Sequence, residues 1–428
     1  MGLSREVNDQ LTQTGRGTLL GDLMRRYWIP ALLSEELPEP DCPPVRLKLL
    51  GERLIGFRDS QGRLGILDEL CAHRRASLWF GRNEQCGLRC AYHGWKFDVE
   101  GHCVDLPSEP EESGMRRRIR LKSYPVLERG GVIWAYLGPS EQRPEPPALE
   151  WALVAPARRF VSKRLQECNY LQAMEGGIDS SHVSFLHSGA LNSDPLFAGS
   201  KGNQYNLGDR MPHFEVTEFD GGLLIGARRR AEGGKFYWRI TPWIMPFYTL
   251  VAPRADHPIN GHAWVPIDDA HCWAWSISYH PHRALSAAEV AAMKDGQGIH
   301  ARYVPGTFVP RANQNNDYLM DREAQRAGLS FSGVEGIAMQ DASLQESMGP
   351  IVDRAEENLA STDNGIIMAR RKLLAAARAN RLGQPIPGLS AASQRVRSCA
   401  IELPGEVDFK RGAEHGLFAD IGSAPVSV

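Results

Sequence analysis

Short runs of alternating apolar and polar residues begin near Val45 and indicate β-strands joined by tight turns. Turn-forming residues at 51–52 and 60–62 separate the first runs, and the pattern resumes after residue 93. The Pro-rich stretch 139–147 then interrupts it. The pattern predicts a small antiparallel β domain that ends in this stretch. The expected strands include 47–50, 53–57, 64–67 and 132–136.

A second block of longer apolar runs, rich in aromatic residues, lies between residues 205 and 282. This composition is typical of antiparallel strands, and we expect a curved sheet that closes over a pocket, with most aromatic side chains in its core. The expected strands are 206–216, 222–226, 235–240, 245–252, 261–267 and 272–280.

Helical periodicity follows the second block, at 286–294, 314–326 and from Met339 onward. Residues 361–363 are expected to cap a closing helix that lays its apolar face against the sheet, and 391–428 reads as a strand-poor tail. The apolar face consists of Ile366, Ile367, Ala369, Leu373 and Leu374. The expected fold class is α+β. Its parts are a helical segment at 1–40, the β domain at 41–147 and a sheet-and-helix domain at 148–428.

Composition excludes several partners. The chain has 428 residues, with 49 Lys and Arg against 51 Asp and Glu, so charge gives no case for a nucleic acid or an anionic membrane. No run of eighteen apolar residues suggests a membrane span, and the N-terminus lacks a signal-peptide core. Eight scattered cysteines lack the density of a secreted scaffold and favour the cytoplasm.

The first chemical motif is Cys71-Ala-His73, then sixteen residues, then Cys90-Ala-Tyr-His93. Two thiolates and two imidazoles on two short turns are the ligand set of a Rieske [2Fe–2S] cluster. A structural zinc site is the alternative. Zinc ligands usually pair Cys with Cys and His with His, whereas each pair here is mixed, so the spacing favours the cluster.

The second motif is Asp179-x-x-His182-x-x-x-x-His187. Taken alone, it could be a capping aspartate beside two surface histidines. Downstream of a Rieske motif, the two imidazoles predict an Fe(II) site that needs one more carboxylate and leaves one face open. Gly15-Arg-Gly17 does not complete a dinucleotide-binding loop. We therefore expect electrons to come from another protein.

The chain resembles the Rieske non-haem iron oxygenases through Cys-Ala-His-Arg at 71–74 and Cys-Ala-Tyr-His-Gly-Trp-Lys-Phe-Asp at 90–98. The stretches 77–82 and 106–109 resemble the phthalate dioxygenase branch in particular. Many relatives carry Pro and Gly where this chain has Ala72 and Arg75. The resemblance implies a Rieske domain at 41–147 and a mononuclear iron domain at 148–428.

The resemblance also assigns roles to residues. His182 and His187 would bind iron, and Asp341 in Met-Gln-Asp341 would complete the triad, with Glu346 and Asp353 as the alternatives. Asp179 would link His182 to His93 of a neighbouring subunit. Head-to-tail packing of this kind implies a homotrimer or two stacked trimers.

The expected activity is that of a terminal oxygenase component acting on an aromatic substrate with O2. Electrons would come from a reductase carrying flavin and a plant-type [2Fe–2S] domain. Arg210, Arg239 and Arg254 are candidates to grip an aromatic carboxylate, although each could instead be a surface or structural arginine. The alternatives are monooxygenation of an aromatic ether or methyl group, and a non-catalytic Rieske electron-transfer protein. The remaining alternative is a zinc-stabilised binding module.

Overall fold

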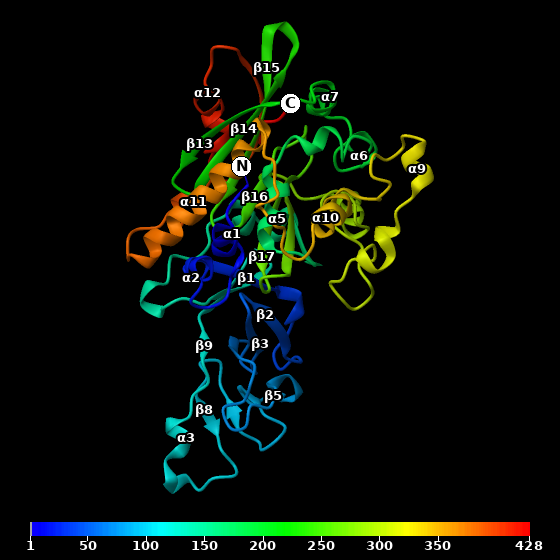
Figure 1. Cartoon of the computed structure of the whole chain (residues 1–428). Helices are drawn as coiled ribbons and strands as arrows, with labels where there is room; N and C mark the ends of the chain where they lie inside the picture. Colours follow the sequence, from blue (N-terminus) through cyan, green and yellow to red (C-terminus); the bar gives the residue numbers. More distant parts are fainter. Residues whose placement is uncertain (1) are drawn as a thin grey trace.

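The computed structural model describes residues 2–428 and has two β-rich parts (Figure 1). The N-terminal part contains two four-stranded antiparallel sheets, of order β2-β3-β4-β9 and β5-β6-β7-β8. The first consists of β2 (Val45–Leu49), β3 (Glu52–Arg58), β4 (Leu64–Asp68) and β9 (Ser123–Tyr124). The second consists of β5 (Arg82–Glu84), β6 (Gly87–Arg89), β7 (Lys96–Phe97) and β8 (Cys103–Asp105). Figure 1 shows β5 and β8 at the end of this part remote from the large sheet.

A three-stranded sheet of order β1-β11-β10 connects the two parts. It consists of β1 (Trp28–Leu33), β10 (Val126–Arg129) and β11 (Val132–Tyr136). Strand β1 was not expected, because all of its residues are buried and its Pro30 interrupts the alternation that marks a half-buried strand. Two helices precede it, α1 (Arg5–Thr12) and α2 (Leu19–Met24), and both pack against the long helix α11 (Asn364–Arg381) of the second part.

The second part is built on an eight-stranded antiparallel sheet of order β12-β18-β17-β16-β15-β14-β13, with β19 paired to β15. Its strands are β12 (Arg159–Gln166), β13 (His213–Phe219), β14 (Gly222–Arg230), β15 (Lys235–Ile244), β16 (Tyr248–Val251), β17 (Ile259–Pro266), β18 (Cys272–Tyr279) and β19 (Cys399–Pro404). The expected α+β class, with an N-terminal β domain followed by a sheet covered by helices, is confirmed.

One strand assignment from the sequence was wrong. The run expected at 206–216 begins as helix α7 (Lys201–Gly208), and the strand starts only at His213. The tail expected to be poor in strands supplies one, β19, whose Cys399 to Pro404 pair with Ile240 to Lys235. Its partner strand β15 is ten residues long and extends beyond the hairpin to β16, so it can pair with a segment far along the chain.

Helices α5 and α10 position the chemistry described below. Helix α5 (Tyr170–Ile178) packs against β16, β17 and β18, and α10 (Ile337–Ser347) packs against α5. Helix α11 covers β13 and β14, with Ala369 and Leu373 buried. The remaining helices are α3 (Met115–Arg118), α4 (Glu150–Leu153), α6 (Ala190–Ser193), α8 (Ala287–Lys294), α9 (Arg322–Arg326) and α12 (Phe409–Leu417). Within residues 2–428, no helix combines the length and the apolar content needed to cross a bilayer.

Candidate functional site

Two matching turns carry the four residues of the first motif. In each, the cysteine carbonyl accepts a hydrogen bond from the residue four positions later, Arg75 in one turn and Gly94 in the other, both at 3.0 Å. Both of these residues have left-handed φ, +61° for Arg75 and +77° for Gly94. The second turn connects β6 to β7, so the short sheet fixes its position. The two Cys–His pairs of the first motif therefore lie on turns of the same geometry.

The four side chains of this motif converge. The Nδ1 atoms of His73 and His93 lie 3.1 Å apart, while Cys71 and Cys90 are buried behind them. Burial is the main cause that raises the pKa of the Cys71 thiol to about 12, and the adjacent Cys90 adds to it. Two adjacent thiols that are shielded from water are suited to bind one metal centre together. Two buried sulfurs and two accessible imidazoles fit the unequal irons of a Rieske cluster.

The second motif wraps around the C-terminal end of α5. Asp179 ends this helix and accepts hydrogen bonds from the backbone N–H groups of Ser181 at 2.6 Å and His182 at 3.2 Å. His182 begins a short 3-10 turn, and His187 follows it. The third residue, Asp341, comes from α10, which packs against α5. Its Oδ1 lies 3.3 Å from Nε2 of His187 and 3.6 Å from Nε2 of His182.

Hydrogen bonds orient both imidazoles. Nδ1 of His182 lies 3.1 Å from Oδ2 of Asp179, and Nδ1 of His187 lies 2.8 Å from Oε1 of Gln340. The Gln340 side-chain amide is fixed in turn, because its Nε2 donates to the carbonyl of Val334 at 3.0 Å. Both Nδ1 atoms are therefore placed to carry the proton, which leaves the Nε2 lone pairs facing Asp341.

Electrostatics keep Asp341 ionised. Burial opposes its charge, but the neighbouring His187, followed by His182, lowers the pKa of the Asp341 carboxyl to about 2. One ligand atom each from His182, His187 and Asp341 lies within 4.8 Å of the others. Two imidazoles and a carboxylate on one side of a pocket fit the donor set that holds non-haem Fe(II) with open positions.

The two alternative carboxylates do not reach this cluster. Glu346 accepts hydrogen bonds from the Tyr318 hydroxyl and the backbone N–H of Glu167. Asp353 is exposed and accepts from the backbone N–H of Ala355 at 3.0 Å. Of the three candidates, the fold brings only Asp341 to the histidines.

The three candidate arginines differ in burial and in distance from the pocket. Arg239 and Arg254 line the pocket that contains His182, His187 and Asp341, and they are only 6% and 7% exposed. Arg210 lies outside this pocket, is exposed, and places its guanidinium 5.4 Å from the ring centre of Phe185. Arg210 is therefore not placed to contact a substrate in the pocket.

Arg239 and Arg254 form hydrogen bonds with uncharged side chains. Nη1 of Arg239 donates to the Ser180 hydroxyl at 3.0 Å, and Nε of Arg254 donates to Oδ1 of Asn203 at 3.2 Å. Neither forms a salt bridge within residues 2–428. Burial lowers the pKa of both guanidinium groups, that of Arg254 to about 10.

Sequence reasoning missed two residues of the site. Gln340 directly precedes Asp341, so its role could have been suspected only once that helix was known to face His187. His262 lines the pocket and stacks on Trp264, with ring centres 4.7 Å apart. In the sequence it is a lone histidine within a mostly apolar strand, which gives no signal by itself.

Comparisons with known proteins agree with this geometry. Residues 27–125 match the family model of the Rieske [2Fe-2S] domain, and 135–411 match the LigXa C-terminal domain like family. The chain is 38% identical to the 3-chlorobenzoate-3,4-dioxygenase oxygenase subunit of Comamonas testosteroni, over 97% of this chain and 99% of that protein. It is 36% identical to the phthalate 4,5-dioxygenase oxygenase subunit of Pseudomonas putida, over 94% and 92% of the two chains.

Solved structures show the same fold. Dicamba monooxygenase bound to dicamba superposes with a TM-score of 0.57 at 20% identity, covering 84% of this chain and 98% of that chain. The cofactors are thus a Rieske [2Fe–2S] cluster and a mononuclear iron. The chain belongs to the Rieske non-haem iron aromatic-ring-hydroxylating oxygenases, as an oxygenase subunit of the phthalate dioxygenase-like branch.

Proposed function

We propose that this oxygenase hydroxylates an aromatic carboxylate. The observation that carries the proposal is the burial of Arg239 and Arg254 in the same pocket as His182, His187 and Asp341. A guanidinium group binds a carboxylate with two parallel hydrogen bonds, and a buried pair of them would orient the ring above the metal position.

Desolvation favours an acid over a neutral substrate. A buried charge without a partner is costly, and neither pocket arginine has a carboxylate partner within residues 2–428. An aromatic ether or methyl compound would leave both guanidinium groups uncompensated, whereas a carboxylate would satisfy them. The names of two relatives, a 3-chlorobenzoate and a phthalate dioxygenase, also refer to acids. Monooxygenation of an aromatic ether or methyl group stays the alternative.

The site residues take the following proposed roles. Cys71, His73, Cys90 and His93 would hold the cluster, and His182, His187 and Asp341 would hold the iron. When bound, the two groups supply electrons and a place where O2 is reduced. Asp179 and Gln340 would keep Nε2 of each imidazole unprotonated and aimed at the metal position. The apolar lining, including Phe197 and Trp264, would exclude water.

We further propose a head-to-tail homotrimer, or a pair of stacked trimers. The cluster end exposes Trp79, Phe80 and Tyr92, and Phe80 is 68% exposed. Near His182, Phe185 packs on Phe331, which is itself 57% exposed. Both apolar surfaces stay exposed in the single chain. A heterologous contact between them would bring His93 of one copy toward Asp179 of the next, and it would close as a ring.

We propose that a separate reductase is the electron donor, since the names of the relatives describe oxygenase and iron-sulfur subunits of multicomponent systems. We propose specifically that this reductase carries flavin and a plant-type [2Fe–2S] domain. We also propose a cytoplasmic location. The decisive experiment for substrate class is a panel of phthalate isomers, chlorobenzoates and matched aryl methyl ethers under ¹⁸O2. Labelled product from acids and none from ethers supports the proposal. Labelled product from ethers alone would refute it.

A further inference from the structure

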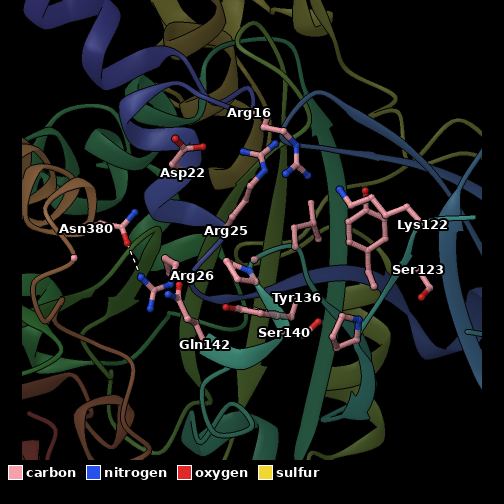
Figure 2. A pocket seen from close by; sticks show the side chains of 16 residues that line it. Arg16, Asp22, Arg25, Arg26, Lys122, Ser123, Tyr136, Ser140, Gln142 and Asn380 are labelled. Atoms are coloured by element: carbon pink, nitrogen blue, oxygen red, sulfur yellow. Dashed lines mark hydrogen bonds between the residues drawn. The ribbon is translucent and has the colours of Figure 1, made fainter.

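A second cavity, of about 540 Å³, lies away from the iron pocket and shares no residue with it (Figure 2). Helix α2, strand β11, the segment before β9 and the C-terminal end of α11 meet there. Four basic side chains line it, Arg16, Arg25, Arg26 and Lys122. Figure 2 shows the Tyr136 hydroxyl on the wall of this cavity, pointing toward Arg26.

The inner wall contains a buried hydroxyl beside a guanidinium group. The Tyr136 hydroxyl and Nε of Arg26 are both buried; the hydroxyl oxygen faces the Arg26 guanidinium, and the hydroxyl proton has no acceptor within residues 2–428. Tyr136 is 0% exposed. Leaving such a group unsatisfied costs roughly 1–3 kcal/mol. An unpaired hydroxyl proton beside a guanidinium group points to a ligand that supplies an acceptor.

Arg26 keeps a free hydrogen-bond donor for an oxyanion. Its Nη1 donates to Oδ1 of Asn380 at 2.6 Å, and it has no salt bridge within residues 2–428. Its Nε is buried beside the Tyr136 hydroxyl, whereas its Nη2 has no hydrogen-bond partner within residues 2–428. Nη2 and the Tyr136 hydroxyl can each donate a hydrogen bond to an oxygen of a carboxylate or phosphate.

The charges around the cavity favour an anion. Glu52 is shared by three of the cations, Arg25 at 2.8 Å, Arg16 at 2.9 Å and Lys122 at 3.3 Å. Asp22 also lines the cavity and accepts a hydrogen bond from the backbone N–H of Gly17. Four cations therefore face two carboxylates, and the surplus is positive. Arg25 is fully used by Glu52 and backbone carbonyls, so Arg26 is the cation left without a carboxylate partner. Lys122 contacts Glu52 through one of three ammonium donors and is exposed enough to face a ligand as well.

We propose that this cavity binds a small oxyanion, a carboxylate or a phosphate. Arg26 and Tyr136 would bind it at the inner wall, and Lys122 would face it from the other side. The bound ligand would tie α2 and the end of α11 to β11 and thereby stabilise the junction between the two parts of the chain. A ligand that binds only the folded state raises the unfolding temperature.

The test uses calorimetric titration and thermal unfolding of the full-length holoenzyme. Inorganic phosphate and succinate are compared with chloride at matched ionic strength. The expected result is saturable heat and a raised unfolding temperature for at least one of the two. Phosphate alone would identify a phosphorylated ligand, and succinate alone a carboxylate. No saturable heat with either anion would overturn the proposal.

Variants place the binding in this cavity. Arg26→Gln should weaken binding of the effective anion by at least about tenfold, since it removes a charged contact. Tyr136→Phe removes only the hydroxyl, whose proton has no acceptor within residues 2–428, so it should fold normally and still bind about tenfold more weakly. Arg117→Gln removes an exposed charge on α3 and should bind like the wild type. Unchanged affinity in both cavity variants would overturn the proposal.

Discussion

Nδ1 of His187 lies 2.8 Å from Oε1 of Gln340, the residue that directly precedes Asp341 on α10. One helix therefore supplies the carboxylate of the proposed iron site and also the group that sets the tautomer of one of its histidines. Because Nε2 of Gln340 is held by the Val334 carbonyl, its oxygen is the atom that must face the ring. This coupling makes Gln340 a positioning residue.

Gln340→Leu should lower iron affinity by roughly 10- to 100-fold, the usual effect of losing such a hydrogen bond to a metal-binding histidine. The measurement is iron content after dialysis against a graded chelator. Gln345→Leu is the matched control. It removes another buried amide of α10, bound to Gln166 at 2.6 Å, without touching His187. Equal iron loss in both variants would show a general effect of α10 instead.

Asp341→Ala should deplete the mononuclear iron while the visible spectrum of the cluster stays unchanged. The reason is that Asp341 is the only one of the three candidate carboxylates beside His182 and His187. Glu346→Gln, five residues along the same helix, should keep its iron. Metal analysis together with absorption spectroscopy separates the two sites. Normal iron occupancy in Asp341→Ala would move the third ligand elsewhere.

Much of this site could be predicted from the sequence, because its residues are close together in two short motifs. Asp179, His182 and His187 lie close together at the end of α5 and in and just after the following 3-10 turn, so local spacing carries the information. Tertiary contacts decide the rest. Arg239 and Arg210 both fall in runs expected to be strands, and only the fold shows that Arg239 lies buried in β15 while Arg210 lies exposed between α7 and β13. Likewise, β19 becomes a strand because the open edge of β15 accepts it.

The left-handed positions in the two cluster turns should respond differently to substitution. A Cβ at Gly94 would lie 2.8 Å from Cγ of Pro107, so Gly94→Ala adds a clash to a conformational cost of roughly 1–2 kcal/mol. Arg75 already adopts this conformation with a side chain. Arg75→Gly should be close to neutral, because the relieved strain offsets the extra freedom of the unfolded chain.

The measurement for these turns is thermal unfolding followed through the visible absorption of the cluster. Gly94→Ala should lose that absorption at a lower temperature than the wild type, and Arg75→Gly close to the wild-type temperature. A larger loss of stability in Arg75→Gly than in Gly94→Ala would contradict the left-handed geometry assigned to the second turn.

Arg239→Met should raise KM for an aromatic acid substrate by at least about tenfold, because the carboxylate loses a charged partner in a desolvated pocket. Arg210→Met, an equal change at an exposed arginine outside the pocket, should leave KM unchanged. Product formation should be measured instead of NADH consumption, since uncoupled oxidation mimics activity. Equal KM values in both variants would argue against an acid substrate bound at Arg239.

Asp179→Asn tests the proposed link between subunits. The amide can keep one accepting oxygen for the backbone N–H of Ser181, but its NH2 group cannot accept the proton of His182 Nδ1, now 3.1 Å from the carboxylate. We expect product formation in a single turnover of pre-reduced enzyme to slow by roughly 10- to 100-fold. Reduction of the cluster by the reductase should stay normal, and iron content, measured on the same sample, shows whether the metal is retained. Full single-turnover rate with iron bound would mean that electrons reach the iron without Asp179.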